Sequence, residues 1–299
     1  FIFNKSGVQT FSYSGAASDY VQYVINSGST LQLLTGLAIG TSAAAPQSKF
    51  TVNGVLDAGT NVISGGSAGT VFLLNSGATL KTAVATGVTG TITLAGTKTY
   101  NNGANYEFTG SSAITNTNFS NTTMNNLTNS NTNSTTLGSG PLSVNGNLVL
   151  TAGNLAMGSN NISLAGNLSG PGITSGAGKV IMTGSGKTIS NPGISNLEIN
   201  SGGTISCTGT PTVTGNLTLT GGTLSDGGNI VTVNGSILGA GTHASTGAGR
   251  IFLNGNTPGI SGATLGNIRI NNPTTLTFTG SPTVNGNFDQ AGFNPVSIA

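Results

Sequence analysis

The sequence carries little charge. Only 8 Lys or Arg and 6 Asp or Glu occur in 299 residues, so 5% of the chain is charged, against roughly a quarter of an average soluble domain. The net charge is +2, and no run of basic residues occurs. Because nucleic-acid binding needs clustered Lys and Arg to neutralise phosphates, we expect no nucleic-acid partner.

Aromatic and reactive side chains are also scarce. Trp is absent, and the chain holds 5 Tyr, 3 Met, 1 Cys and 1 His. The single Cys207 cannot form an internal disulfide. No apolar stretch approaches the ~18 residues of a membrane-spanning helix, so we do not expect the chain to span a membrane. The sequence starts at Phe1 without a charged and apolar leader and stops at Ala299 inside a repeat, so we expect an excerpt of a longer chain.

The chain is instead rich in glycine and in short apolar runs. Gly accounts for 49 residues, 35% of the residues are hydrophobic, and Val, Ile, Leu and Thr recur throughout. Disordered chains combine low hydrophobicity with high charge, so this composition indicates a folded chain.

Two long segments repeat each other, the first feature to look for in a biased sequence. From Gly176 onward the offset between them is constant, so Lys179 aligns with Arg250 and Ile199 aligns with Ile270. The block GAGKVIM in the first segment matches GAGRIFL in the second. We therefore divide one continuous solenoid into diverged coils at 1–140, repeat copies at 141–210 and 211–281, and the start of a further copy at 282–299.

A shorter unit recurs within each copy: an apolar residue, a polar or small residue, then Gly or Ser. It is found at Val144, Leu164, Met182 and Ile199, and again at Val213, Val233, Leu253 and Ile270. The steps within the first copy are similar in length, whereas the step from Ile199 to the next copy is shorter. We interpret each copy as four coils.

Short runs within each unit alternate apolar and polar residues, as in Leu217 to Thr220. Such alternation, broken by Gly, Asn or Pro, predicts strands joined by turns, and no helical period of useful length occurs. Strands stacked at this period predict an all-β fold, a right-handed parallel β-helix (β-solenoid) of roughly 18–20 residues per coil. The alternation predicts inward side chains at Val213, Leu217, Leu219, Val231, Val233, Ile251, Leu253, Ile268, Ile270, Leu276 and Phe278.

Several blocks carry a resemblance to a known class of proteins. The repeat regions of large secreted Bacteroidetes surface proteins, substrates of type IX secretion, are similar to FNKSGVQTFSYSG, SKFTVNGVLDAGTNVISGG, TKTYNNGANYEFTGSSA and VNGNLVLTAGNLAMGSNNISLAG. Those proteins resemble filamentous haemagglutinin-like and autotransporter β-helix adhesins. The resemblance implies secretion to the bacterial cell surface, and a role in adhesion, filaments or gliding. It implies partners among copies of the chain itself, surface glycans or other surface components.

We expect a non-enzymatic shaft or stalk of a cell-surface adhesin or filament, without a cofactor. A glycan-binding β-helix module is the first alternative, and a polysaccharide lyase-type enzyme is the second. Sugar-cleaving chemistry needs carboxylates, or acidic calcium ligands, on neighbouring coils. No two acids lie one coil apart in sequence, so we expect neither a catalytic nor a metal site among Asp19, Asp57, Glu107, Glu198, Asp226 and Asp289.

One constellation has the residue types of a nucleophilic triad. His243 follows Asp226 by nearly one coil and shortly precedes Ser245, a spacing that could stack Asp against His on adjacent coils. The preceding copy has Met157 and Thr174 where these Asp and His residues stand, which argues against Ser–His–Asp chemistry. We expect His243 to be a solvated turn residue.

The repeat alignment also indicates the roles of Cys207 and of the cations Lys179 and Arg250. Cys207 aligns with Phe278 and Leu137, which predicts a buried apolar filler rather than a reactive thiol. Lys179 and Arg250 share a repeat position, which favours a solvated or coil-spanning cation over a ligand-specific one.

The Asn-rich segment and the tyrosines are each compatible with a structural role and with a binding role. The segment 116–133 holds 8 Asn, which suit either a ladder within stacked turns or a glycan-contacting loop. The tyrosines all lie within the first 106 residues and can either pack in the core or stack on sugar rings: Tyr13, Tyr20, Tyr23, Tyr100 and Tyr106.

Overall fold

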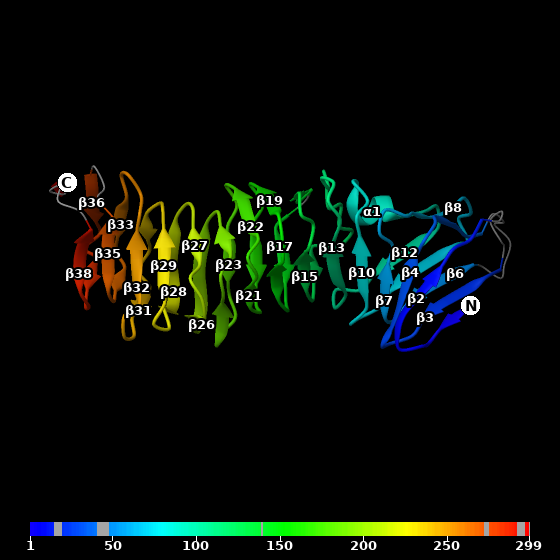
Figure 1. The fold of residues 1–299 in the computed structure, drawn as a ribbon, viewed down its shortest axis with the longest axis horizontal. Coiled ribbons are helices and arrows are strands. Elements are labelled where there is room, and N and C mark those ends of the chain that lie inside the picture. The colour runs from blue at the N-terminus through cyan, green and yellow to red at the C-terminus, as the bar shows by residue number, and fades with distance from the viewer. Residues whose placement is uncertain (15–19, 41–47, 139, 272–274, 292–296, 299) are drawn as a thin grey trace. The chain divides into compact units, whose positions relative to one another are not determined.

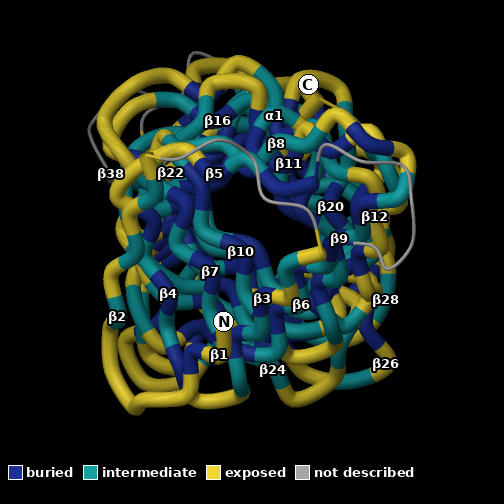
Figure 2. The backbone as a smooth tube through the Cα atoms, turned by 90° about the vertical axis from the view of Figure 1, so that its right-hand side faces the viewer, coloured by how far each residue is buried: buried dark blue, intermediate teal, exposed yellow. Residues whose placement is uncertain are grey.

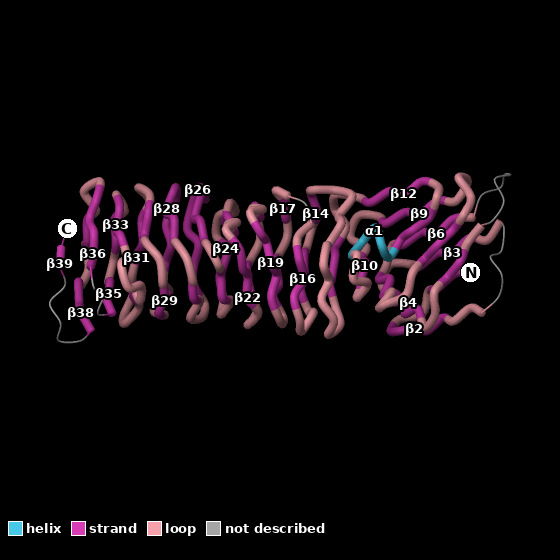
Figure 3. Tube along the Cα trace, turned by 90° about the horizontal axis from the view of Figure 1, so that it is seen from above, coloured by secondary structure: helices cyan, strands magenta, loops and turns pink. Residues whose placement is uncertain are grey.

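A computed structural model describes residues 1–14, 20–40, 48–138, 140–271, 275–291 and 297–298. The chain is nearly all-β, and its parallel strands stack as a β-solenoid of about 14 turns, which confirms the predicted fold class. It divides into two compact units: unit 1 is Phe1–Asn145 with Ala152–Asn154, and unit 2 is Gly146–Thr151 with Leu155–Ala299. The single helix among the described residues is α1 (Gly87–Thr91; Figure 3). No described helix is long and apolar enough to span a membrane.

Unit 1 stacks most of its strands in three runs of parallel strands, and Figure 1 labels members of each run. One sheet stacks β1 (Ile2–Phe3), β3 (Gln22–Ile25), β6 (Lys49–Val52), β9 (Val71–Leu74) and β12 (Thr97–Tyr100). A second run stacks β2 (Gly7–Phe11), β4 (Ser29–Leu33), β7 (Val55–Asp57), β10 (Thr79–Thr82), β13 (Asn105–Phe108) and β15 (Leu127–Asn129). The third stacks β5 (Leu37–Ala38), β8 (Ile63–Gly65) and β11 (Ile92–Leu94). Strand β14 (Thr123–Met124) pairs with β17 (Leu142–Val144), and Thr135 of β16 (Ser134–Thr136) bridges to Ile114.

Unit 2 also has three runs of stacked parallel strands. The first contains β18 (Leu148–Leu150), β21 (Leu168–Ser169), β24 (Lys187–Ile189), β26 (Leu197–Cys207), β28 (Leu217–Ser225), β31 (Thr242–Ala244), β34 (Thr264–Leu265) and β37 (Thr283–Val284). The second contains β20 (Ile162–Leu164), β23 (Val180–Met182), the starts of β26 and β28, β30 (Ile237–Leu238), β33 (Gly259–Ser261), β36 (Thr275–Thr279) and β39 (Ser297–Ile298). The third contains β19 (Asn154–Gly158), β22 (Ile173–Gly176), β25 (Gly193–Ile194), β27 (Thr212–Val213), β29 (Ile230–Val233), β32 (Arg250–Leu253), β35 (Ile268–Asn271) and β38 (Phe288–Ala291).

Parallel register places inward side chains in columns that run from turn to turn. In unit 2, Ile194, Val213, Val233, Leu253 and Ile270 are successive register partners, and all are completely buried. Buried positions lie inside the coils and exposed positions lie at the outer turns (Figure 2). Each such side chain contributes about 1.5–3 kcal/mol relative to an exposed one, so the columns are the main stabilising feature of the fold.

Turn length differs between the units. Register partners in unit 2, such as Val213 with Val233 and Ile251 with Ile268, keep close to the spacing of the predicted coil. Many turns of unit 1 are longer, as the pairing of Ile63 with Ile92 shows. The coil length predicted from the C-terminal copies therefore does not extend to the diverged region.

The interpretation of each repeat copy as four coils is wrong. Ile199 has Leu219, and not Val213, as its register partner on the following turn. Val213 instead pairs with Ile194, in a different run of strands. The short step from Ile199 to Val213 therefore passes from one side of a turn to another, and equivalent residues of the two copies lie on different sides.

Ten of the eleven predicted inward residues are buried; Phe278 is the exception. Phe278 pairs with Ile260 of the preceding turn, which places it in an inward column, but its side chain is only half-buried. No described residue of the following turn is its register partner, because the pairing of β36 with β39 covers Thr275 and Leu276 alone.

Leu219→Asp tests the inward columns. Leu219 is 1% exposed, so the substitution buries an unpaired charge and should lower the free energy of unfolding by on the order of 3–5 kcal/mol. The half-buried Phe278→Asp should cost less. The outward-facing Thr232→Asp is the matched control and should change stability by less than about 0.5 kcal/mol. Urea unfolding of the three variants measures this; equal midpoints for Leu219→Asp and the wild type would contradict the column assignment.

Candidate functional site

Three of the five tyrosines are core residues. Tyr23, Tyr100 and Tyr106 are 2%, 6% and 3% exposed. The Tyr23 ring stacks on Phe50 of the next turn with their centroids 5.4 Å apart, and burial raises the pKa of the Tyr100 and Tyr106 hydroxyls. Of the two alternatives, these three tyrosines follow core packing, because their side chains point into the coil.

The remaining two tyrosines are accessible. Tyr13 is half-buried, and Tyr20 is 48% exposed with a backbone φ of 65°. A positive φ is uncommon for a residue other than glycine and occurs mostly in turns. Tyr13 and Tyr20 are therefore the only members of the predicted set that can meet a ligand.

The asparagine-rich segment uses its amides between turns. The Asn105 Oδ1 atom accepts hydrogen bonds from the Asn125 and Asn126 Nδ2 atoms at 2.9 and 2.7 Å. Asn129 and Asn131 are completely buried, and their Nδ2 atoms donate to the carbonyl oxygens of Ala152 and Ser112, both at 2.9 Å. These amides form the ladder that one of the two alternatives predicts, and they join neighbouring turns.

The described acids are each engaged locally. Three form ion pairs between neighbouring turns: Glu107 with Lys81 at 2.8 Å, Glu198 with Lys179 at 2.9 Å, and Asp289 with Arg269 at 3.6 Å. The Asp57 Oδ1 atom accepts a hydrogen bond from a turn N–H, that of Gly59. No group of three or more His, Cys, Asp or Glu in the described ranges could hold a metal ion, and Asp19 lies outside those ranges.

The expectation of a solvated His243 is wrong. His243 pairs in register with Leu224, so it occupies an inward position and its side chain has no exposed surface. Its Nε2 atom lies 3.3 Å from Asp226 Oδ2. The other carboxylate oxygen of Asp226 accepts hydrogen bonds from the backbone N–H groups of Gly228 and Thr246 at 3.0 and 3.1 Å. The stacking of Asp against His that the spacing allowed is therefore realised, inside the coil.

Burial sets the protonation of this cluster. It lowers the pKa of His243, and the neighbouring Asp226 carboxylate opposes that shift without reversing it. Burial, followed by the Asp226 charge, raises the pKa of the Cys207 thiol to about 12. Cys207 is 3% exposed, which confirms it as a buried filler, and a thiol with that pKa is not a nucleophile at neutral pH.

The third member of a nucleophilic triad is not in place. Ser245 Oγ accepts a hydrogen bond from the Asn267 N–H at 2.8 Å, and neither ring nitrogen of His243 makes an aligned hydrogen bond within the described structure. A pocket of about 330 Å³ has His243 and Ser245 among its lining residues, but the His243 side chain has no exposed surface. Without a bond from imidazole to hydroxyl, the cluster cannot activate Ser245.

The first repeat copy has different residues at the positions of Asp226 and His243. Asp226 and His243 stand where the first copy has Met157 and Thr174, and Thr174 is itself buried, with its hydroxyl 3.1 Å from that of Ser195. The first copy therefore also has a buried polar contact between turns, but it joins Thr174 to Ser195 of the following turn and does not involve Met157. We interpret Asp226 and His243 as a structural contact of the second copy.

The buried His243 should make stability depend on pH. The unfolded imidazole has an ordinary pKa of about 6.5 and the folded one a lower pKa, so the unfolded chain binds more protons between these values. The free energy of unfolding should fall as the pH drops below about 6.5, by at most ~1.4 kcal/mol per pH unit. Urea unfolding from pH 7.5 to 5.5 measures this slope.

His243→Gln is the matched variant, because its amide can still donate to Asp226. The chain has a single His, so the slope should disappear in this variant. The same slope in the variant and the wild type would show that the imidazole is not its origin.

Comparisons with protein-family models, with curated proteins and with solved structures found no match.

Proposed function

We propose that this chain is a structural shaft or stalk of a bacterial cell-surface adhesin or filament, acting mechanically in attachment or gliding. One observation carries the proposal: charged and amide side chains are used to join successive turns. The ion pairs Lys81–Glu107 and Lys179–Glu198 and the Asn105 amide contacts all connect one turn with the next.

Such bonds suit a load-bearing element. In a solenoid each turn contacts only its neighbours, so stability is distributed along the chain. Two kinds of contact then hold neighbouring turns of the solenoid together: apolar columns inside the coil, and ion pairs and amide hydrogen bonds between polar side chains. Pulling two turns apart must break both sets of contacts.

The proposed location is the extracellular face of a bacterial cell, which rests on the sequence resemblance. The proposed partners are other copies of the chain and surface glycans. Low charge supports close lateral packing, because few charges must be desolvated when two such surfaces meet.

An enzymatic role has less support. A lyase or glycosidase needs carboxylates free to meet the substrate. Each described acid already bonds to a neighbouring side chain or turn, and no two of them are register partners.

Force spectroscopy of single full-length chains tests the mechanical proposal. Pulled between its termini, the chain should resist extension and then lengthen in steps that correspond to one or a few turns. Leu219→Asp should reduce the force of the steps near that residue, with Thr232→Asp as the control. A chain that extends like an unstructured polymer would overturn the proposal.

Polysaccharide cleavage tests the enzymatic alternative. The purified chain should release neither unsaturated nor reducing ends from acidic or neutral polysaccharides, with or without calcium. Release by the wild type that is lost in Glu107→Gln or Asp226→Asn would favour a lyase-type enzyme instead.

A further inference from the structure

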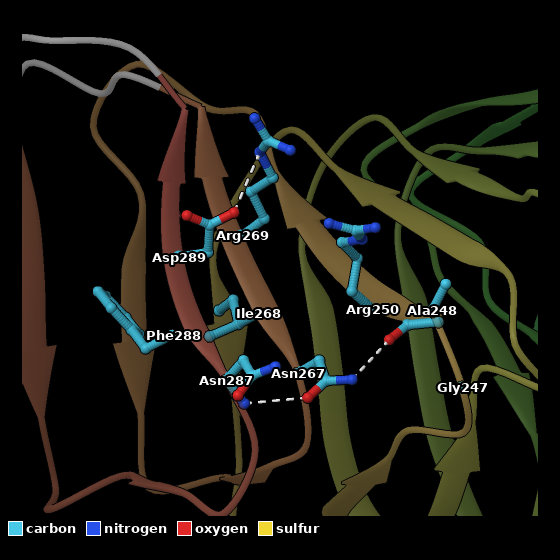
Figure 4. A pocket seen from close by; sticks show the side chains of 10 residues that line it. Gly247, Ala248, Arg250, Asn267, Ile268, Arg269, Asn287, Phe288 and Asp289 are labelled. Atoms are coloured by element: carbon cyan, nitrogen blue, oxygen red, sulfur yellow. Dashed lines mark hydrogen bonds and ion pairs between the residues drawn. The ribbon is translucent and has the colours of Figure 1, made fainter.

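Two arginines of unit 2 share a pocket. Arg250 begins β32 and Arg269 lies in β35, the next strand of the same sheet. Their buried neighbours Ile251 and Ile268 point inward, so both arginines face outward. They line a pocket of about 410 Å³, and Figure 4 shows Asp289 beside Arg269 in it.

The preceding repeat copy provides a built-in reference for this site. In the repeat alignment, Lys179 is the equivalent of Arg250 and Glu198 is the equivalent of Arg269. The Lys179 and Glu198 side chains form an ion pair of 2.9 Å. Burial opposes the shift, but the hydrogen bonds from Lys179 and Thr220 hold the pKa of the Glu198 carboxyl below its usual range, which favours its ionised form.

The two copies build the same scaffold around these positions. A Gly-Ala-Gly turn precedes the first cation in each copy, at 176–178 and at 247–249. The Asn196 amide donates to the Gly178 carbonyl at 3.4 Å, and the equivalent Asn267 amide donates to the Gly249 carbonyl at 3.0 Å. The side chains at these positions therefore differ in charge between the copies, although the same Asn-to-Gly hydrogen bond is present in both.

The second copy has Arg269 where the first copy has the acid Glu198, so its positive charge is poorly compensated. No described acid lies within ion-pair distance of Arg250, and Arg269 meets only Asp289, at 3.6 Å, with side chains 40% and 55% exposed. Ion pairs this exposed contribute little. The Nε atoms of both arginines are buried and have no hydrogen-bond partner among the described residues, so only the outer N–H groups of each guanidinium can meet a ligand.

We infer that Arg250 and Arg269 bind the carboxylate or sulfate group of an acidic sugar. A guanidinium presents a planar fork of N–H donors that matches such oxyanions. A second hollow of about 190 Å³ adjoins the site, and Ile230 and Phe252 line it together with the two arginines. An apolar wall beside a cationic one suits a sugar ring that carries an acid group. The inference does not depend on the mechanical role.

A single acid group on a ring fits better than nucleic acid. Binding to a phosphate backbone draws on several cations along the strand, whereas two arginines line this pocket in a chain of net charge +2.

Isothermal titration of the full chain tests the site. The probes are oligogalacturonate, which carries carboxylates, and dextran sulfate, with neutral dextran and single-stranded DNA of matched charge as comparisons. One or both acidic saccharides should bind at least tenfold more tightly than neutral dextran. Equal affinity for neutral dextran, or equal affinity for the DNA, would overturn the assignment to an acidic sugar.

Matched variants locate the binding. Arg269→Glu places an acid beside Arg250, as Glu198 stands beside Lys179, and should weaken binding by about 10- to 100-fold. Arg250→Gln should weaken binding similarly, as a second variant without an added acid. Lys179→Gln removes the equivalent cation of the first copy and should leave affinity unchanged. Full affinity in folded Arg269→Glu and Arg250→Gln, or an equal loss in Lys179→Gln, would overturn the site.

Discussion

Hydrogen bonding between successive turns is the constraint on which this structure depends. A short strand cannot satisfy its own backbone N–H and C=O groups, so each turn must pair with the turn before and the turn after it. Parallel pairing fixes the register, and register places each side chain directly above another. The apolar columns, the asparagine ladder and the ion pairs between turns are all consequences of that alignment.

Stacking also restricts where charge can lie. Direct or diagonal neighbours of the same sign repel, so the described acids Glu107 and Glu198 stand next to lysines. The diagonal pair of Arg250 and Arg269 departs from this rule, and only the exposed Asp289 offsets it. Where two like charges are neighbours on an outer face, as here, a bound anion can provide the negative charge that the chain lacks.

Sequence periodicity predicted the coils because inward positions recur with the turn, as Val213, Val233 and Leu253 show. It could not tell a step along a column from a step around a turn, so the step from Ile199 to Val213 was misread. Residue type alone assigned His243 to solvent, whereas its register with Leu224 buries it. Tyr23 was likewise ambiguous, since aromatic side chains serve both cores and sugar sites. The arginine pair was visible in the repeat alignment, but only the structure showed that the two positions touch one pocket.

The mismatch between repeat length and turn length has a physical consequence. Had each repeat copy made a whole number of turns, each residue would share a column with its equivalent in the other copy. Instead Asp226, which replaces Met157, lies beside Cys207 and against His243. A substitution in one copy therefore meets different neighbouring residues from those around the equivalent position of the other copy. This frees the copies to diverge, so one can keep the Lys179–Glu198 pair while the other opens the same scaffold to an anion.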